Sequence, residues 1–431
     1  MFERNLSVRP SVLRRIVKDA ITEKDGKRTP VMIWGPPGVG KTEIIHQIAD
    51  EVGARTVARH LGQMEPTDLM GVPVVRDEGV KWEVSSIMPK RVIRKVRETR
   101  EDGRVSMAYP NDGRDYAVMF WKGNTLVARK NDPFANNVGN IDIISENGRS
   151  YVVGPGDVDF VEFGERCILF LDELSTADEA VQNAALQLVL DRRVGDYELP
   201  SNVPVLAAGN RECDGAYVNP MSMPLANRFM HLTIRVDVDE WVDWATANAI
   251  NPVIVGFIKT FPNELHQMDP DTIGEGNYGY PTPRSYVFLS RELKDYEYYQ
   301  GLYDDVDNGR EHFEAVVSGL IGSAAASKFY GYYKTMHGMP SGQDIAQNTE
   351  KARSFDKTKV DKGVFFGIAI SCIQYLTDRY RNLPPEKKVE SLHEEVDRVF
   401  QFLYKNCDEE LVIWSLRNLS RINKSIPLIL T

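Results

Sequence analysis

The stretch "VMIWGPPGVGKTEIIHQIAD", residues 31–50, sets the architecture of the first half of the chain. Four apolar residues precede a glycine-rich loop, and an amphipathic helical pattern follows the loop. The loop fits the pattern G-x-x-x-x-G-K-[ST], in which backbone N–H groups turn inward around phosphates. The helix that follows such a loop adds its positive amino-terminal end. A strand, this loop and a helix, in that order, predict a nucleotide-binding site.

Individual side chains of the loop have defined expected roles. Lys41 is expected to reach the β- and γ-phosphates, and the hydroxyl of Thr42 is expected to bind Mg²⁺. A turn that matches the pattern by chance is the alternative, and the strand and helix on either side argue against it. The predicted nucleotide-binding loop comprises Gly35, Pro36, Pro37, Gly38, Val39, Gly40, Lys41 and Thr42.

The region from about residue 28 to 236 alternates short apolar runs with helical patterns. Helices are expected at 40–52 and 178–191. Near-continuous apolar strands with helices between them indicate a parallel sheet that is covered on both faces. The expected strands are "VMIW" (31–34), "RTVARH" (55–60), "CILFLDE" (167–173), "VPVLAAG" (203–209) and "MHLTIRV" (230–236).

Residues 90–163 interrupt this rhythm and are interpreted as an insertion with its own small sheet. The segment "KRVIRKVRETREDGR" is predicted to be a basic helix. The segments "YAVMFWKGNTLVARK" and "NIDIISENGRSYVVG" place alternating apolar residues around Gly-Asn and Asn-Gly. Such dipeptides favour tight turns, so both segments are predicted to be β-hairpins.

The chain becomes helical after residue 237. Candidate helices are 238–250, 251–261, 285–299, 311–336 and 363–380, and the polar run 341–362 is predicted to be a flexible connection. The expected domains are a nucleotide-binding core over 1–236, a helical lid over 237–340 and a helical extension over 341–431.

The composition narrows the class of protein and its location. The 431 residues carry 52 Lys and Arg against 62 Asp and Glu, a net charge of −10, which argues against a surface built to coat DNA. The four cysteines form no CxxC pair, so a reducing cytoplasm is expected. The first residues, "MFERNLSVRPSVLRRIVKDAI", form an amphipathic helical pattern instead of a signal peptide. The sequence contains no run of 18 consecutive apolar residues, so no membrane span is expected.

Two carboxylates end the apolar run "CILFLDEL". Asp172 and Glu173 follow four apolar residues, and burying unpaired charge there would cost several kcal/mol per ion, by order of magnitude. A metal–nucleotide complex gives them a purpose: Asp172 is expected to bind Mg²⁺, and Glu173 is expected to activate the attacking water. A strand that ends in solvent is the alternative, which the neighbouring phosphate loop disfavours.

Three more polar residues complete the expected site. Asn210 ends the strand "VPVLAAGN" and is expected to orient water, with an ordinary Asn turn as the alternative. Arg228, in "PLANRF", is a candidate arginine finger, a residue that stabilises transition-state charge. Arg284, in "PTPRS", is expected to touch the phosphates from the helical part. Each signal is weak alone, and their order along the chain strengthens them.

These motifs resemble those of the AAA+ ATPases and, within them, the MoxR-like group. The matching stretches are "GPPGVGKT" (Walker A), "ILFLDEL" (Walker B), "AAGN" (sensor 1), "LANRF" (arginine finger) and "PTPRS" (sensor 2). The segment "GQMEPTDLMGVP" is similar to the stretch that leads into an insert in helix 2 of that group. The resemblance covers about 28–90 and 164–340, and the chain departs from the group's pattern at 90–163.

The resemblance implies an α/β fold: an AAA+ P-loop core with a five-stranded parallel sheet, a β-rich insertion and a helical C-terminal lid. It also implies a ring homo-oligomer, most often a hexamer, in which Arg228 acts on the neighbour's nucleotide. The stretch "DRRVGDYELP" (191–200) resembles a hairpin before sensor 1. Its Arg192 and Arg193 are candidates for contacting the neighbouring subunit, with an exposed hairpin stem as the alternative.

The expected activity is hydrolysis of ATP with Mg²⁺. By resemblance, the first hypothesis is a chaperone-like remodeller of a separate partner protein, of a kind that often carries a von Willebrand factor A domain, with 90–163 as a docking site. The alternative is a nucleic-acid-associated motor or loader, suggested by the basic run from Lys90 to Arg104, which acidic residues interrupt. A nucleotide-gated scaffold without catalysis is the third hypothesis, disfavoured because every expected catalytic group is present.

Overall fold

The computed structural model describes residues 7–22, 28–76, 79–95, 114, 116–122, 125–128, 142–146, 149–153, 160–268, 278–301, 306–383 and 392–422. The chain forms two compact units, Met1–Arg235 and Val236–Thr431. A further division of the second unit at residue 340 stays a prediction.

The first unit is an α/β structure built on a six-stranded sheet with the order β1-β16-β2-β15-β12-β3. All its neighbouring strands run parallel. The strands are β1 (Ser7–Val8), β2 (Val31–Trp34), β3 (Arg55–His60), β12 (Cys167–Asp172), β15 (Val205–Gly209) and β16 (Met230–Ile234). The parallel sheet predicted from the apolar runs is therefore confirmed.

The prediction of five strands was one strand short. Residues 7–8, which we placed in an amino-terminal helix, form β1 and pair with the outer edge of β16. Helix α1 (Pro10–Ile21) begins at a proline, and a residue that precedes proline is disfavoured in helical conformation. Residues 7–9 are therefore extended, and an open edge of the sheet accepts them.

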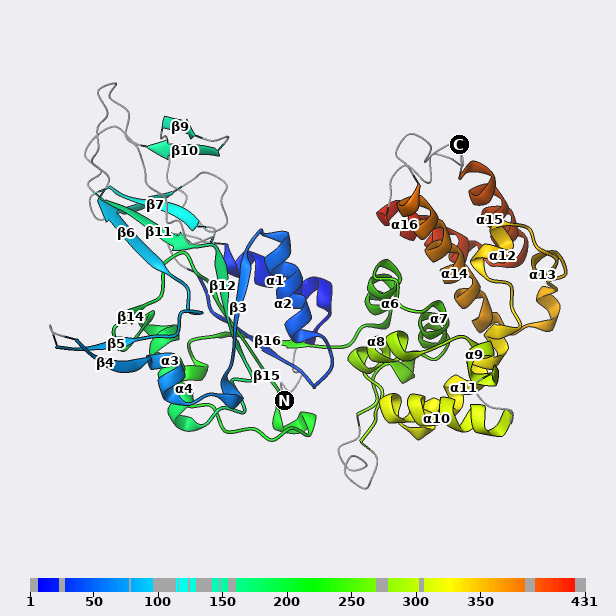
Figure 1. Cartoon of the computed structure of the whole chain (residues 1–431), viewed down its shortest axis with the longest axis horizontal. Helices are drawn as coiled ribbons and strands as arrows, with labels where there is room; N and C mark the ends of the chain where they lie inside the picture. Colours follow the sequence, from blue (N-terminus) through cyan, green and yellow to red (C-terminus); the bar gives the residue numbers. More distant parts are fainter. Residues whose placement is uncertain are drawn as a thin grey trace, which may run out of the picture. The chain divides into compact units, whose positions relative to one another are not determined.

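Helices cover both faces of this sheet (Figure 1). Helices α1 and α2 (Lys41–Glu51) lie on one face, and α3 (Pro66–Met70) and α4 (Glu179–Leu190) lie on the other. All six residues of β12 are buried, and alternate side chains of a strand point to opposite faces. Leu169 and Leu171 join the cluster that α4 covers, which leaves Ile168 and Phe170 for the opposite face.

The insertion between β3 and β12 has its own sheet, and both predicted hairpins are confirmed. Its four-stranded sheet has the order β6-β11-β7-β8, and β9 and β10 form a separate antiparallel pair. The strands are β6 (Arg91–Lys95), β7 (Tyr116–Lys122), β8 (Thr125–Ala128), β9 (Asp142–Glu146), β10 (Arg149–Val153) and β11 (Phe160–Glu165). Arg166 alone separates β11 from β12, so the insertion continues directly into a core strand.

The predicted basic helix over 90–104 is wrong where the structure describes it. Arg91–Lys95 is a strand that pairs antiparallel with β11. Val92 and Ile93 are β-branched and suit a strand when a partner strand is available. The pairing partner lies about seventy residues further along the chain, so the local pattern did not reveal it. Residues 96–104 lie outside the described part of the chain.

A buried carboxylate fastens the base of the insertion to the core. Glu165, at the end of β11, is 1% exposed. It accepts hydrogen bonds from Arg55 Nε of β3 (3.0 Å), from Arg114 Nη1 (2.7 Å) and from the backbone N–H of Lys90 (3.1 Å). Removing a partner from a buried charge is strongly destabilising. The base of the insertion is therefore held firmly to the sheet.

Two small hairpins lie beside this base. One consists of β4 (Val72–Arg76) and β5 (Gly79–Glu83), and the other of β13 (Arg193–Val194) and β14 (Tyr197–Glu198). The backbone N–H of Trp82 donates to Asp196 Oδ2 (2.9 Å), which ties the two hairpins together. The second confirms the hairpin expected in 191–200.

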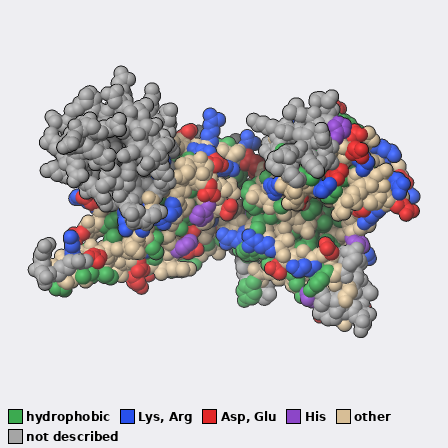
Figure 2. All heavy atoms as spheres, turned by 45° about the horizontal axis from the view of Figure 1, so that its top comes forward, with side chains coloured by type: hydrophobic (Ala, Val, Ile, Leu, Met, Phe, Trp, Pro, Cys, Tyr) green, Lys and Arg blue, Asp and Glu red, His purple; other side chains and the backbone are tan. Residues whose placement is uncertain are grey.

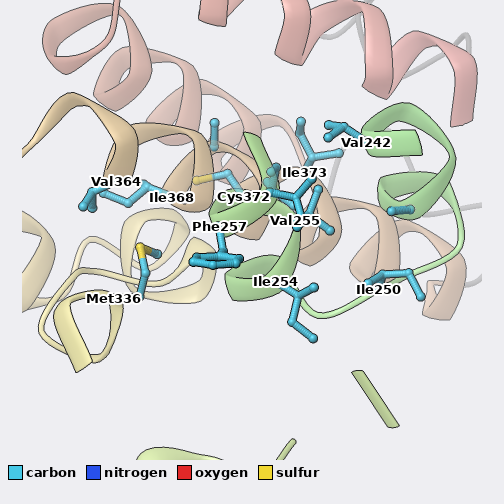
Figure 3. Close-up of a cluster of buried hydrophobic side chains, with 14 of the residues drawn as sticks. Val242, Ile250, Ile254, Val255, Phe257, Met336, Val364, Ile368, Cys372 and Ile373 are labelled. Carbon is cyan, nitrogen blue, oxygen red and sulfur yellow. The ribbon is translucent and has the colours of Figure 1, made fainter. Parts of the chain in front are cut away.

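The second unit is entirely helical in its described residues. Helices α7 and α14 pack closely, and Figure 3 shows Phe257 of α7 near Met336 of α11 and Ile368 of α14. The helices are α6 (Val238–Ala247), α7 (Pro252–Thr260), α8 (Pro283–Glu292), α9 (Tyr296–Gly301), α10 (Val306–Ile321), α11 (Ser323–His337), α12 (Gly342–Ala346), α13 (Glu350–Arg353), α14 (Lys362–Asn382), α15 (His393–Asn406) and α16 (Glu409–Ile422). The segments 285–299 and 311–336 each contain two helices where one was expected, and Gly322, at a φ of 79°, separates α10 from α11.

The predicted flexible connection over 341–362 is wrong. Ser341 Oγ accepts from the backbone N–H of Asp344 (3.1 Å), and the Asp344 carboxylate accepts from that of Ser341 (3.0 Å). This reciprocal cap begins α12 and places Ile345 in the core. A Cβ on Gly342 would lie 2.3 Å from the Ser371 carbonyl oxygen of α14, so glycine allows α12 to pack there. Polar composition concealed a short packed helix.

In the part of the chain that the structure describes, no helix has the length and apolar content that crossing a membrane requires.

Candidate functional site

The phosphate loop takes the backbone conformation that its glycines allow. Gly38 and Gly40 have φ values of 77° and 91°, a region that L side chains disfavour. A Cβ on Gly35 would lie 2.5 Å from Ile234 Cγ2, so the loop approaches β16 too closely for any other residue. Helix α2 begins directly after Gly40, and its amino end therefore faces the loop.

Lys41 is surrounded by oxygen atoms. Its Nζ donates to the carbonyl oxygens of Gly35 (2.6 Å) and Pro36 (3.0 Å) and to Asn210 Oδ1 (2.7 Å). Asn210 follows β15, which lies beside β2 in the sheet. The ammonium group therefore lies between the loop and the expected water-orienting amide, the position from which it can bind phosphate.

Asn210 is itself held by a residue that sequence reasoning missed. Its backbone N–H donates to Ser175 Oγ (3.0 Å), and Ser175 is buried. A Cβ on Gly209 would lie 2.7 Å from the same oxygen, so glycine makes room for this contact. Ser175 lies three residues after Asp172, in "DELS". The closeness of this hydroxyl to the acidic pair is the feature of the sequence that could have indicated its place in the site.

The expected metal ligands lie together. Thr42 Oγ1 donates to Asp172 Oδ2 (3.2 Å), and Asp172 is 9% exposed. His60, at the end of β3, places Nδ1 3.5 Å from the same carboxylate oxygen. The strand register pairs His60 directly with Asp172. In the sequence, this proximity is indicated only by the place of His60 as the last residue of the predicted strand "RTVARH".

Glu173 lies in a strained backbone conformation. Its φ is 57°, in the left-handed region, which costs a non-glycine residue roughly 1–3 kcal/mol. Neighbouring bonds hold it there: Thr176 donates its N–H (3.0 Å) and its hydroxyl (2.8 Å) to the Glu173 carbonyl. The Glu173 side chain is exposed, and a Cβ on Gly62 would lie 3.2 Å from its Oε2. The strain therefore presents a carboxylate to solvent directly beside Asp172.

The two remaining candidate arginines are both exposed. Arg228 follows α5 (Met223–Ala226) and Arg284 is the second residue of α8, in the helical unit. Within the described ranges, neither guanidinium has a hydrogen-bond or ion-pair partner. Arg284 and the phosphate loop belong to different units, so the contact of Arg284 with phosphate stays a prediction.

The arginines of the 191–200 hairpin bind within their own chain. Arg192 Nη2 donates to the carbonyl oxygens of Pro200 (2.5 Å) and Val203 (2.6 Å), and Arg193 forms an ion pair with Glu198. Arg211, after the sensor segment, binds Asp214, and the Asp214 hydrogen bond raises the pKa of that guanidinium. Contact of Arg192 and Arg193 with a neighbouring subunit stays a prediction.

Comparison with known proteins agrees with this geometry. Residues 31–101 match the model of the family described as "ATPase family associated with various cellular activities (AAA)". That range holds the phosphate loop, α2 and β3. The first unit therefore has the α/β fold of an AAA+ ATPase core. Binding of ATP and its use as a substrate are the general activity of this class.

Comparison with individual known proteins gives only distant similarities. No curated protein matches the sequence. Solved structures that resemble the chain include NtrX from Brucella abortus in complex with ADP (12% identity, 95% of this chain and 68% of that chain, TM-score 0.32). They also include a putative ATPase from Cytophaga hutchinsonii (13%, 75% and 88%, TM-score 0.28) and the RuvB branch-migration motor of Thermotoga maritima (14%, 83% and 85%, TM-score 0.32). At this identity and TM-score, none of them carries an argument about what this chain does.

Proposed function

We propose that this AAA+ protein is a MoxR-like ring ATPase that hydrolyses ATP to remodel a partner protein. One observation carries the catalytic part of the proposal. Lys41 Nζ lies 2.7 Å from Asn210 Oδ1, and Thr42 Oγ1 lies 3.2 Å from Asp172 Oδ2. These contacts gather a cation, an amide, a hydroxyl and a carboxylate at the ends of the adjacent strands β2, β15 and β12. That combination suits a triphosphate and its attacking water.

The residues fit Mg²⁺ as well as phosphate. A hydroxyl and a carboxylate at one point are the oxygen ligands that a hard cation prefers. Thr42 and Asp172 would hold Mg²⁺, which neutralises charge on the β- and γ-phosphates when bound.

The chain's own groups account for the remaining steps. Lys41 and the loop N–H groups bind and orient the phosphates. Asn210 orients the attacking water, and Glu173 accepts its proton. Glu173 suits that role because its carboxylate is exposed beside the buried Asp172.

A ring explains the exposed arginine. Arg228 has no partner within the described ranges, and an arginine finger must be free to reach phosphate on another subunit. We therefore propose a homo-oligomeric ring, most simply a hexamer, with Arg228 serving the neighbour's nucleotide. Arg284 would bind phosphate from the helical unit.

The β4–β5 hairpin supports a protein partner. Val75 pairs with Val80, and Pro73 pairs with Trp82. Because these pairs lie two residues apart, their side chains share one face of the hairpin. Val75 and Val80 are 82% and 63% exposed. Exposed apolar surface of this kind marks interaction sites, so we propose that the partner, such as one with a von Willebrand factor A domain, contacts this face as well as the insertion.

The double variant Val75→Lys/Val80→Glu tests the partner surface. It replaces the apolar pair by an oppositely charged cross-strand pair, which keeps the hairpin paired. We expect unchanged basal ATP hydrolysis and loss of stimulation by a protein that co-purifies from the native host. Lys81→Ala, on the other face, is the control and should behave as wild type. Full stimulation of the double variant would remove this hairpin from the binding surface.

Lys41→Ala tests the phosphate loop. Hydrogen bonds to charged groups contribute roughly 1.5–3 kcal/mol each, so the Kd for ATP should rise about tenfold or more. Titration with a fluorescent ATP analogue measures this, and Lys334→Ala, on the exposed surface of α11, is the control. An unchanged affinity would contradict the assignment of the loop.

One assay separates the remodeller from the nucleic-acid motor. The purified oligomer is tested for ATP hydrolysis with single-stranded DNA and, separately, with the co-purifying protein. We expect stimulation by the protein. On the visible face of the helical unit, Lys and Arg are interspersed with Asp and Glu (Figure 2), in keeping with that expectation. Stimulation by DNA that falls steeply with salt would favour the motor instead.

A further inference from the structure

A histidine outside the expected site connects the phosphate-loop strand to the arginine-finger turn. Trp34, the last residue of β2, precedes Gly35 of the loop directly. Its indole Nε1–H donates to His231 Nδ1 (2.8 Å), and His231 Nε2 lies 2.7 Å from the carbonyl oxygen of Ala226. Ala226 ends α5, two residues before Arg228. One imidazole therefore bridges the start of one functional segment and the base of the other.

The two partners determine the tautomer of His231. An indole N–H can only donate, so Nδ1 must accept from it. A backbone carbonyl can only accept, so Nε2 must carry the hydrogen. The neutral ring with hydrogen on Nε2 satisfies both ends, and its plane lies nearly parallel to that of Trp34, at 13°.

The Ala226 carbonyl belongs to the turn that carries Arg228. It also accepts from the backbone N–H of Phe229 (3.2 Å), while the N–H of Arg228 donates to Leu225 (3.1 Å). Leu225 and Phe229 are buried and anchor the turn on either side of the arginine. The backbone of Arg228 is thus held by its neighbours, while its side chain is exposed.

We propose that His231 is a positioning residue for the Arg228 finger. His231 is itself exposed, so the core does not require it. Its bridge links the strand that carries a subunit's own phosphate loop to the arginine that the subunit offers to the next one. Movement of the loop on nucleotide binding would therefore pass to the finger. This inference rests on the proposed function, because it needs Arg228 to act on a neighbouring subunit.

His231→Ala in the full-length oligomer tests the proposal. Small misplacement of a catalytic group can cost roughly 10²-fold, so kcat should fall by tenfold to about 100-fold. The KM for ATP should stay unchanged, because the subunit's own loop is intact. Adding Glu173→Gln subunits, which have an intact finger and no water activator, should restore hydrolysis at the mixed interfaces. A merely structural defect would not be restored in this way.

Two further variants test the two hydrogen bonds of His231 separately. His231→Gln keeps an N–H for the Ala226 carbonyl and should recover part of the lost kcat. Trp34→Phe removes only the indole donor and should lower kcat less than His231→Ala does. His393→Ala, exposed at the start of α15 in the other unit, is the control and should match wild type.

The outcomes separate this proposal from the proposed function. Wild-type kcat in His231→Ala beside an impaired Arg228→Ala would overturn the positioning role alone. A loss of kcat that Glu173→Gln subunits do not restore would also overturn it. Normal hydrolysis by Arg228→Ala itself would overturn both, since no finger would then remain to be positioned.

Discussion

Glu173→Gln is expected to bind ATP with unchanged affinity and to hydrolyse it about 10²–10⁴-fold more slowly, the usual contribution of a positioned general base. The amide keeps the shape of the side chain and cannot accept the proton of the attacking water. Thr42, Asp172 and Lys41, which we propose to make the phosphate and metal contacts, are untouched. Steady-state phosphate release and a separate ATP titration measure the two quantities. Normal turnover would remove Glu173 from the mechanism.

The left-handed backbone conformation of Glu173 suggests a second variant at the same position. Glycine tolerates a φ of 57° without strain, so Glu173→Gly should also be inactive yet more stable than wild type. The expected gain is about 1 kcal/mol in the free energy of unfolding, measured by denaturant titration. Inactivity together with higher stability would show that the strain serves catalysis. Lower stability would mean that the side chain contributes to the fold.

Arg228→Ala is expected to lower kcat by roughly 10³–10⁵-fold, the range for loss of an arginine finger. The exposed side chain has no partner within the described ranges, so folding and ATP binding should be unaffected. Thermal unfolding and nucleotide titration verify both. Arg284→Ala is a comparison in the other unit, expected to weaken phosphate contact within the same subunit.

Mixing subunits shows in which direction the finger acts. Arg228→Ala subunits keep Glu173, and Glu173→Gln subunits keep Arg228. A mixed ring should therefore hydrolyse ATP at interfaces where the intact groups meet, although each variant alone is inactive. Absence of activity at every mixing ratio would argue against a finger that acts between subunits.

Much of the core followed from local patterns. The strand over 31–34, the glycines of the phosphate loop and the helix after them lie where the spacing predicted them. Asp172 and Asn210 were expected at the ends of neighbouring buried strands, and the structure brings both to the loop. Their assignment as catalytic and metal-binding groups stays a prediction.

Other features depended on contacts that no local pattern contains. The run at 91–95 is a strand because β11 pairs with it, and α12 exists because its apolar residues pack in the core of the helical unit. Ser175 contacts Asn210, which follows β15, and His60 of β3 contacts Asp172. Both contacts depend on β15 and β3 lying beside β12 in the sheet. His231 could not be connected with Trp34 before β16 was known to lie beside β2.

The amino-acid sequence by itself predicted a phosphate-binding glycine loop and buried parallel strands that end in polar groups. Backbone torsion preferences and alternating burial act over a few residues, so both can be read locally. Tertiary structure alone decided which polar groups share an oxygen, which carboxylate is strained, and which arginines have no partner among the described residues. Those outcomes follow from the order of strands in the sheet, which packing between segments far apart in the chain decides.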